Sequence, residues 1–502
     1  MLNGSAGRRF SIRLSIEKDA HAHSTLTLRA FFRQFPEAEV PPGYYRYLRG
    51  EISRAKLFEQ FPKQAANAVA EAQCRTLGSD AEISDLIGAR LAGTKNWVLI
   101  GGPPCQAYSL VGRSRMLGVG RRQENESMEQ HLDRARQKRS AFEGDHRHLL
   151  YREYLKIIER HRPSVFVMEN VKGILSSKLN GSPIFPRILA DLENPVEALG
   201  SSRPGIRYRI CSLVSSPDGD TALRPMDYLI RAEDYGVPQT RHRVILLGVR
   251  EDFFQGKVPI LEQSSGLAVE EVIGDLPRLT SGLSKNPEGK RPYDALEELK
   301  GTKWWNRLRL SPSKQELVRT MTRALADGMR TPQRGARFIE VQRRPPAWYA
   351  DDELKGVCNH ESRSHIREDL WRYFFCACYA RASGGKSPRL VDFPEELLPA
   401  HKNVAEAIAG IKFGDRFRVQ PSDRPSCTVT SHISKDGHYF IHHDPEQYRS
   451  LTVREAARLQ TFPDNYFFEG PRTQQFHQVG NAVPPKLAYQ IAGIVSGLFP
   501  AF

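Results

Sequence analysis

Three short apolar runs constrain the fold of this chain more than any other feature. They span residues 97–100, 164–170 and 243–249; the first ends at Gly101 and the second follows Pro163. Helical patterns, such as residues 20–35 and 148–161, lie between runs of this kind along the chain. Strands that alternate with helices form a parallel sheet with helices on both faces. We therefore expect an α/β domain with a doubly wound, Rossmann-like sheet.

The first apolar run leads to a cysteine at the rim of this sheet. Gly101-Gly-Pro-Pro breaks the strand, and Cys105 follows directly. Open α/β sheets bind their ligands outside the carboxyl ends of the strands. Cysteine is a strong intrinsic nucleophile, although a lone cysteine is often a small buried hydrophobe. Cys105 is therefore a candidate nucleophile, and a core residue is the alternative.

Charge indicates a polyanionic partner. The chain of 502 residues carries 73 Lys and Arg against 58 Asp and Glu, a formal net charge of +15. Much of this charge follows Cys105, in a Gly-containing and Arg-rich segment over residues 112–139. Such a segment can close over a phosphate backbone, so nucleic acid is the expected partner and a merely soluble basic surface the alternative.

The cysteine content and the hydropathy of the chain indicate its cellular compartment. The 7 cysteines are odd in number and include no Cys-x-x-Cys pair, which favours a reducing, cytosolic setting. No apolar run approaches the ~20 residues that span a bilayer, and no signal-peptide core is expected at the N-terminus. We expect a cytoplasmic protein.

The pattern along the chain predicts three parts. Residues 1–250 contain the alternating strands and helices of the main domain. Residues 251–423 have Pro and Gly interruptions and many basic residues, which is typical of an inserted domain of irregular architecture. Residues 424–502 return to the main domain and end in a helix over 484–498. This length fits more than one domain.

Further segments carry residues suited to chemistry. Phe166-Val-Met-Glu169-Asn170-Val171 ends a buried strand in a carboxylate, which suits a general acid; a helix-capping role is the alternative. Gln239-Thr-Arg241-His-Arg243 places two arginines two residues apart, hence on one face of a strand. Residues 451–463 predict a Thr-capped helix, and Gly480-Asn481-Ala-Val483-Pro-Pro predicts a tight turn into the last helix.

In this order, the segments resemble the cytosine-C5 DNA methyltransferase family. The shared motifs are Pro-Pro-Cys105-Gln, Glu169-Asn-Val, Gln-x-Arg241-x-Arg243, Arg-Glu-x-Ala-Arg-Leu-Gln-x-Phe-Pro at 454–463, and Gly-Asn-Ala-Val-Pro-Pro at 480–485. The resemblance covers most of residues 10–250 and 424–498. The stretch between them corresponds to the variable target-recognition domain of that family. The resemblance implies a Rossmann-like methyltransferase sheet and S-adenosylmethionine as cofactor.

The resemblance also implies roles for individual residues. Cys105 would attack C6 of a flipped-out cytosine in duplex DNA, and Glu169 would help to protonate N3. Arg243, supported by Arg241, would hold O2 or order the cytosine pocket. The implied cofactor-binding residues are Glu17, Asp80, Pro104, Asn481 and Val483, with helix capping as the alternative for Asp80. The implied DNA-binding residues are Gln106, Ser109, Arg113 and Arg115. The resemblance further implies that the protein modifies DNA, either as the partner of a bacterial restriction endonuclease or as a solitary methyltransferase.

One family motif is missing from the expected place. The family's fold opens with an apolar strand and a Phe-x-Gly-x-Gly turn, whereas residues 10–17 already match the second strand. A start site chosen too far downstream, a second chain supplying the piece, and a degenerate enzyme are the three explanations. The alternatives to a DNA methyltransferase are a DNA-binding protein without cofactor, and the tRNA-methylating branch of the family, which the long basic insertion argues against.

A metal site is not expected. Cys358, His360, His365, Cys376 and Cys378 lie near one another in the sequence, but their spacing matches no standard zinc site. The helical period of residues 366–380 favours packing of these cysteines in a core instead.

Overall fold

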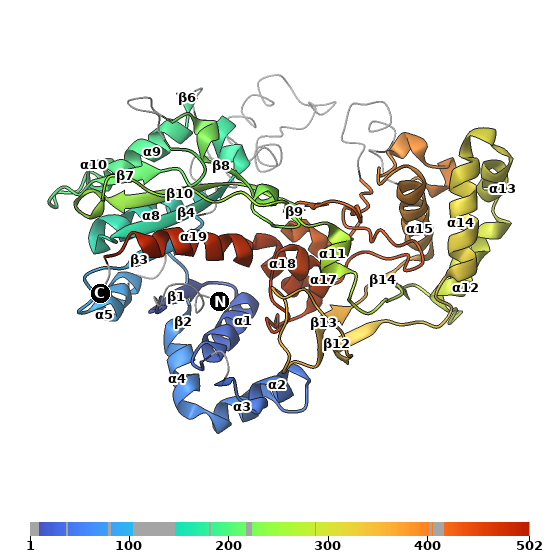
Figure 1. The fold of residues 1–502 in the computed structure, drawn as a ribbon, viewed down its shortest axis with the longest axis horizontal. Helices are drawn as coiled ribbons and strands as arrows, with labels where there is room; N and C mark the ends of the chain where they lie inside the picture. Colours follow the sequence, from blue (N-terminus) through green and yellow to red (C-terminus); the bar gives the residue numbers. More distant parts are fainter. Residues whose placement is uncertain are drawn as a thin grey trace, which may run out of the picture.

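The computed structural model describes residues 10–36, 39–78, 82–103, 146–179, 182–216, 223–286, 288–400, 404 and 416–500 (Figure 1). Part of the predicted site lies outside these ranges, namely Asp80, Pro104, Cys105, Gln106, Ser109, Arg113 and Arg115. The other predicted residues lie inside them: Glu17, Glu169, Arg241, Arg243, Asn481 and Val483. Over the described ranges, no helix combines the length and apolarity needed to cross a membrane.

Five strands form the central sheet. Their order is β3 (Val98–Gly101), β4 (Val165–Val171), β10 (His242–Arg250) and β7 (Tyr208–Cys211), with β8 (Leu229–Arg231) also paired to β10. β3 and β4 are parallel, whereas β10 runs antiparallel to β4, β7 and β8. The sheet is therefore mixed, and the wholly parallel sheet expected from the sequence is wrong. A parallel connection needs a crossover of about a dozen residues or more, usually a helix; between β8 and β10 the chain holds only a 3-10 turn and β9 (Gln239–Thr240).

Helices cover both faces of this sheet, as expected for a doubly wound fold. Phe166 and Met168 of β4 pack with α8 (His146–His161) and α9 (Phe185–Glu193) on one face. Val165 and Val167, the alternate residues, face α19 (Pro485–Gly497) on the other. Because α19 is the last helix, the end of the chain packs on the same sheet as β4. Shorter elements beside the sheet are α10 (Pro195–Leu199), β5 (Lys178–Leu179) and β6 (Ser182–Pro183).

The N-terminal strands form a separate pair. β1 (Ser15–Glu17) and β2 (Ala72–Cys74) are parallel to each other, and α5 (Ile83–Leu91) leads from β2 toward β3. Among the described strands, β1 pairs with β2 alone and β3 with β4 alone, so each of β1 and β3 has an open edge. Between β1 and β2, four helices pack around an aromatic core: α1 (Ala20–Phe32), α2 (Pro42–Leu48), α3 (Arg54–Gln60) and α4 (Pro62–Glu71).

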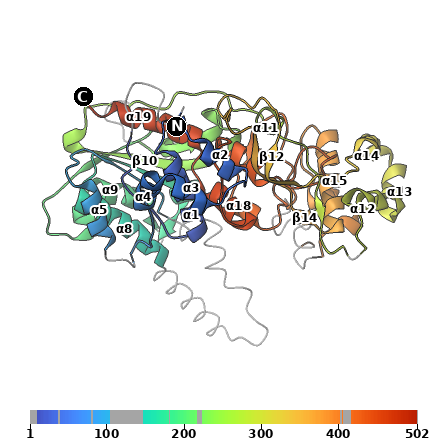
Figure 2. The ribbon, with the colours of Figure 1, turned by 90° about the horizontal axis from the view of Figure 1, so that it is seen from below.

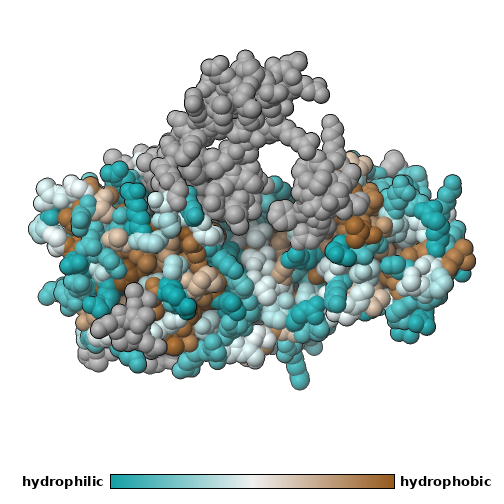
Figure 3. All heavy atoms as spheres, turned by 90° about the horizontal axis from the view of Figure 1, so that it is seen from above, coloured by the Kyte–Doolittle hydropathy of each residue, from teal (hydrophilic) through white to brown (hydrophobic). Residues whose placement is uncertain are grey.

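A helical lobe lies at the far end of the molecule from the central sheet (Figures 1 and 2). It consists of α12 (Pro292–Glu297), α13 (Lys303–Leu310), α14 (Gln315–Asp327) and α15 (Arg367–Ala382), packed around Trp304. The helix predicted at 366–380 is α15, and Cys376 and Cys378 are fully buried in its core, as its helical period indicated. Hydrophilic side chains cover much of the outer end of this lobe (Figure 3).

A third set of elements connects the lobe to the central sheet. It includes α11 (Val269–Ile273), α17 (Val453–Leu459), α18 (Arg472–Asn481) and the paired strands β12 (Gly335–Glu340) and β13 (Gly356–Glu361). The Thr-capped helix predicted from the sequence is α17. Thr452 Oγ1 accepts a hydrogen bond from Glu455 N, and Glu455 Oε2 accepts one from Thr452 N. Two further short pairings complete the fold, β11 (Gly282–Leu283) with β14 (Ser364–His365) and β15 (Ser426–Cys427) with β9.

Candidate active site

The carboxyl end of β4 carries the predicted acid, Glu169. Its Oε1 lies 3.0 Å from Nε of Arg243 on β10, and the two side chains are 22% and 15% exposed. In the antiparallel register Glu169 faces Ile245, so Arg243, two residues earlier, is its diagonal neighbour on the same face. The reversed direction of β10 therefore creates this ion pair and leaves both charged groups within reach of solvent.

The segment that leads to Cys105 passes directly beside Glu169. β3 ends at Gly101, opposite Met168 of β4. A side chain at Gly102 would place its Cβ 3.2 Å from Glu169 Oε2, so a glycine suits this close approach. Asn170 Nδ2 then donates a hydrogen bond to Pro103 O at 3.3 Å. The described chain stops at Pro103, two residues before the predicted nucleophile.

Arg241 has different partners from Arg243. Its side chain is buried, and its Nη1 donates to Val429 O at 2.8 Å. Both Nη1 and Nη2 lie 3.3 Å from Gly480 O. Burial, reinforced by the like charge of Arg243 and opposed by Glu169, lowers the pKa of Arg241 to about 9. Residue 241 falls between β9 and β10, so regular strand alternation does not dictate where its guanidinium points.

Two glutamine side chains beside this arginine form a contact that the sequence did not predict. Gln239 Nε2 donates to Leu459 O at 3.0 Å and to Gln460 Oε1 at 3.1 Å. Gln239 Oε1 accepts from Val429 N at 2.7 Å, and Gln460 Nε2 donates to Val479 O at 2.7 Å. Gln239 belongs to the Gln-x-Arg-x-Arg motif and Gln460 to the motif at 454–463, so the two residues are 221 positions apart in the sequence. Only their contact shows that they act as one link.

The described cofactor candidates lie close to the ends of two helices that pack together, α1 and α18. Glu17 ends β1, and its Oε1 accepts a hydrogen bond from Asp19 N at 2.9 Å just before α1. Asn481 is the exposed last residue of α18, and Val483 follows it half-buried. α1 packs against α18. The structure thus brings Glu17 and Asn481 onto neighbouring elements, each at a helix end.

The cluster considered for zinc is dispersed among other contacts. His360 bonds to Thr452 Oγ1 and Pro277 O, at 2.9 and 2.8 Å, and His365 contacts Ser450 Oγ at 3.2 Å. Cys376 and Cys378 lie in the core of the helical lobe. Where the structure describes the chain, no group of three or more His, Cys, Asp or Glu side chains is arranged to hold a metal ion.

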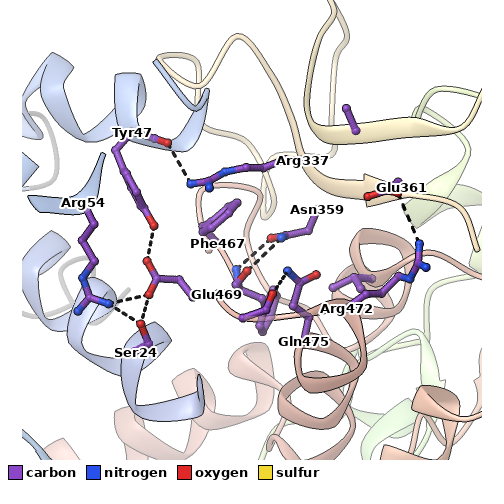
Figure 4. A pocket seen from close by; sticks show the side chains of 14 residues that line it. Ser24, Tyr47, Arg54, Arg337, Asn359, Glu361, Phe467, Glu469, Arg472 and Gln475 are labelled. Atoms are coloured by element: carbon purple, nitrogen blue, oxygen red, sulfur yellow. Dashed lines mark hydrogen bonds and ion pairs between the residues drawn. The ribbon is translucent and has the colours of Figure 1, made fainter. Parts of the chain in front are cut away.

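A cavity of about 460 Å³ lies elsewhere, between α1, α2, the β12–β13 pair and α18 (Figure 4). Its charged groups pair with one another: Arg54 Nη1 lies 2.7 Å from Glu469 Oε2, and the hydroxyls of Ser24 and Tyr47 also contact this carboxylate. The guanidinium of Arg337 lies over the ring of Tyr47. Neither Glu169 nor Arg243 lines the cavity, so it is a polar seam between segments and separate from the candidate site.

Comparison with known proteins identifies a family for this chain. The sequence profile described as C-5 cytosine-specific DNA methylase matches residues 134–198 and 227–496, which is more than half of the chain. Type II methyltransferase M.Bpa9945I of Bacillus paralicheniformis is 33% identical over 512 residues, covering 97% of this chain and 94% of that protein. Type II methyltransferase M1.HphI of Haemophilus parahaemolyticus is 25% identical over 467 residues, which cover 93% of this chain and 82% of that protein.

Among solved structures, the S. pombe Dnmt2 methyltransferase aligns with 91% of this chain and 95% of its own, with a TM-score of 0.32 and 11% identity. The profile match spans both strands that carry the Glu169–Arg243 pair and the helices α17 and α18. On the profile match and the 33% identity to M.Bpa9945I, the chain belongs to the C-5 cytosine-specific DNA methylase family.

Proposed function

We propose that this DNA methyltransferase transfers a methyl group from S-adenosylmethionine to C5 of a flipped-out cytosine, with Cys105 as the nucleophile and Glu169 as the acid. One observation carries this assignment within the family: the segment Gly102–Pro103 runs beside the Glu169 carboxylate. Consecutive Cα atoms are about 3.8 Å apart, so Cys105 is covalently held within ~8 Å of Pro103. Glu169 and the thiol can therefore face one substrate ring.

The chemistry assigns a distinct task to each side chain. As a thiolate, Cys105 Sγ forms a bond to C6, while the Glu169 carboxyl group gives its proton to N3 and so draws charge off the ring. Arg243, ion-paired to Glu169, can hold O2 with its rigid guanidinium. S-adenosylmethionine, when bound, supplies an electrophilic methyl group for C5. The C5 proton then leaves, the C6–Sγ bond breaks, and both the aromatic ring and the Cys105 thiolate are restored.

Covalent trapping tests this mechanism. DNA amplified with 5-fluorodeoxycytidine carries fluorine where the C5 proton must leave, so the C6–Sγ bond should persist. With S-adenosylmethionine, wild-type protein should give an SDS-stable adduct whose peptide maps to Cys105. Cys105→Ala should bind the same DNA but form no adduct. Failure of the wild-type protein to form an adduct while it binds DNA and cofactor would overturn the assignment.

Binding of the cofactor is proposed at Glu17, Asn481 and Val483, together with Asp80 and Pro104. The Glu17 carboxylate ends a strand, where an acid can accept the ribose hydroxyls, and Asp19 N orients one of its oxygens. The exposed amide of Asn481 at the end of α18 can reach a bound ligand. Titration calorimetry should show S-adenosylmethionine binding that Glu17→Gln weakens. A wild-type protein without heat of binding would instead be a DNA-binding protein that has lost its cofactor.

Duplex DNA is proposed as the substrate, held by Gln106, Ser109, Arg113 and Arg115 and read by residues 251–423, between the catalytic parts 1–250 and 424–502. The charge of +15 supports a polyanionic partner. The relatives that are named type II methyltransferases support a modification role beside a restriction endonuclease, in the bacterial cytoplasm and on its DNA. Filter binding should favour duplex DNA over tRNA and weaken steeply with salt. A preference for tRNA would favour the tRNA-methylating branch.

A further strand is proposed to pair with the open edges of β1 and β3. Ile100 on β3 is 77% exposed, an unusual state for an apolar strand residue in an α/β sheet. Unpaired strand edges accept another strand readily. An apolar strand with a Phe-x-Gly-x-Gly turn would suit this place, whether a longer form of the chain or a second chain carries it. Adding such a peptide should slow amide exchange over residues 98–101 and tighten cofactor binding; unchanged exchange would contradict the proposal.

A further inference from the structure

Arg241 is a buried cation whose hydrogen bonds go to carbonyl oxygens. Its side chain is 2% exposed, and Nη1 and Nη2 donate to Val429 O and Gly480 O. Its Nε is buried without a hydrogen-bond partner. Burying a guanidinium without a tightly bound carboxylate is costly. The contacts with the two carbonyl oxygens therefore fix where this cation lies.

The acceptors identify what Arg241 connects. Gly480 lies in the last turn of α18, where helix carbonyls lack intrahelical partners and a cation is favourable. The next residue is the cofactor candidate Asn481. The backbone at Ser431 approaches Gly480 so closely that a Cβ there would lie 2.3 Å from Ser431 N. Arg241 therefore clamps the end of α18 and the segment after Val429 against the start of β10.

Arg241 is also close in the chain to the Glu169–Arg243 ion pair. Arg243 follows it by two residues and ion-pairs with Glu169 at 3.0 Å. Asn481 follows the acceptor Gly480 by one residue. The path from the Glu169–Arg243 pair to Asn481 thus runs through one guanidinium and only three peptide steps. The Gln239–Gln460 link provides a second tie from β9 to α17 and α18, and Gln460 Nε2 also donates to Ala482 O at 3.4 Å, next to Asn481.

We propose, on the basis of the function proposed above, that Arg241 is a positioning residue that aligns the methyl donor beside Asn481 with the cytosine held by Glu169 and Arg243. Its side chain is buried and its Nη1 and Nη2 donate to Val429 O and Gly480 O, so Arg241 does not itself hold the base. Loosening it lets the end of α18 shift relative to β10. A displacement of about 1 Å in an active site can cost ~10²-fold in rate. The loss should fall on methyl transfer and spare activation of the base.

Two reactions of the same protein separate these steps. Addition of Cys105 to C6 makes C5 nucleophilic, so without cofactor C5 can take up a solvent proton and release tritium from [5-³H]cytosine DNA as the thiolate leaves. This exchange needs Cys105 and Glu169 but no methyl donor. Methyl transfer in a single turnover needs all of them. The ratio of the two rates therefore reports alignment alone and is independent of the folded fraction.

Arg241→Met should lower the single-turnover methyl-transfer rate about 30- to 100-fold, while tritium exchange stays within about threefold of wild type. Arg241→Lys, which can reach one acceptor, should recover part of the transfer rate. Parallel loss of both rates would assign Arg241 to the base or to general stability, and retention of both would remove it from the mechanism. Either result overturns the proposal. A wild-type protein with neither activity would instead refute the proposed function.

Arg363 provides a matched control. It is also a buried guanidinium that donates to carbonyl oxygens, those of Ile433 and Lys435, with Nε left without a hydrogen-bond partner. Neither acceptor belongs to β10, although Ile433 lies in the turn that packs on α18 and the guanidinium lies over the ring of Phe476 in that helix. Arg363→Met should lower the midpoint of thermal unfolding and leave the ratio of transfer to exchange within about threefold of wild type. An equal change of the ratio in this variant would show that loss of any buried arginine produces the effect, and would overturn the specific role of Arg241.

Discussion

The Glu169–Arg243 pair and the Arg458–Asp464 pair use the same chemistry in opposite ways. Glu169 and Arg243 meet once, at 3.0 Å, and remain partly exposed at a strand end. Arg458 and Asp464 are both fully buried, and Nε and Nη2 of the arginine bind the two carboxylate oxygens at 2.9 and 2.8 Å. Asp275, which follows α11, also binds Arg458.

The difference shows which pair is built for structure. Burial alone would raise the pKa of Asp464, but the attraction and hydrogen bonds of Arg458 lower it below its usual range. Such a buried pair is costly to break from one side. The Glu169–Arg243 pair can change partners because solvent reaches it, as a proton donor must. The exposed pair therefore suits the proposed proton transfer, whereas α17 with its buried pair stabilises the packing of distant segments.

The largest expected effect is on catalysis at the exposed pair. Glu169→Gln removes the proton donor and should slow single-turnover methyl transfer by about 10²–10⁴-fold. Its effect on the free energy of unfolding should stay within about 1 kcal/mol, since the ion pair is partly solvated. Rapid-quench kinetics and urea unfolding measure the two quantities. Near-normal turnover would show that Glu169 does not take part in methyl transfer, and the exposed pair would then not differ in function from the buried one.

The buried pair should respond in the reverse manner. Arg458→Met leaves Asp464 buried without its main partner and should lower the free energy of unfolding by about 3–5 kcal/mol. Arg458→Lys retains the charge but loses the two-pronged contact, so its loss should be smaller. Folded protein at low temperature should keep its methyl-transfer rate. A stable but inactive Arg458→Met variant would show that the Arg458–Asp464 pair also serves catalysis.

A smaller effect, dependent on pH, is expected at His360 near the N-terminus of α17. Nε2 donates to Pro277 O and Nδ1 accepts from the Thr452 hydroxyl, which requires the neutral ring. Burial lowers the pKa of His360 to about 4. Since the unfolded value is about 6.5, stability is complete above pH 6.5 and declines as pH falls toward 4; the loss by pH 5 is about 2 kcal/mol.

Urea unfolding of wild type and His360→Gln at pH 7 and pH 5 isolates this contribution. The variant should be weaker at pH 7 and show a smaller further loss at pH 5, because it cannot take up the proton. An identical pH dependence in both proteins would show that His360 does not couple folding to protonation.

The smallest effect is expected at the cap of α17. Thr452→Ala removes the side-chain acceptor for Glu455 N and should lower the free energy of unfolding by about 1 kcal/mol. Thr452→Ser retains the hydroxyl and should stay close to wild type. Calorimetric unfolding measures both variants. A larger loss in the alanine variant than in His360→Gln would mean that the cap, rather than the histidine, dominates this end of the helix.

The sequence predicted those parts of the fold that depend on near neighbours. The apolar runs that became β3, β4 and β10, the cap at Thr452 and the acid at position 169 all follow from residues close to them in the chain. The direction of β10 was mistaken, because pairing direction depends on how the chain returns between strands. The different targets of Arg241 and Arg243 were also missed for this reason.

By itself, the sequence determined the family, the order of its motifs and the residue types at the strand ends, since these are local patterns with a chemical meaning. Only the tertiary structure decided that Arg243 pairs with Glu169 and that Arg241 binds Gly480, 239 residues away along the chain. Such contacts depend on strand register and on which backbone carbonyls remain unpaired at a distant helix end. Neither is written in the residues around position 241, because both arise only when the segments pack.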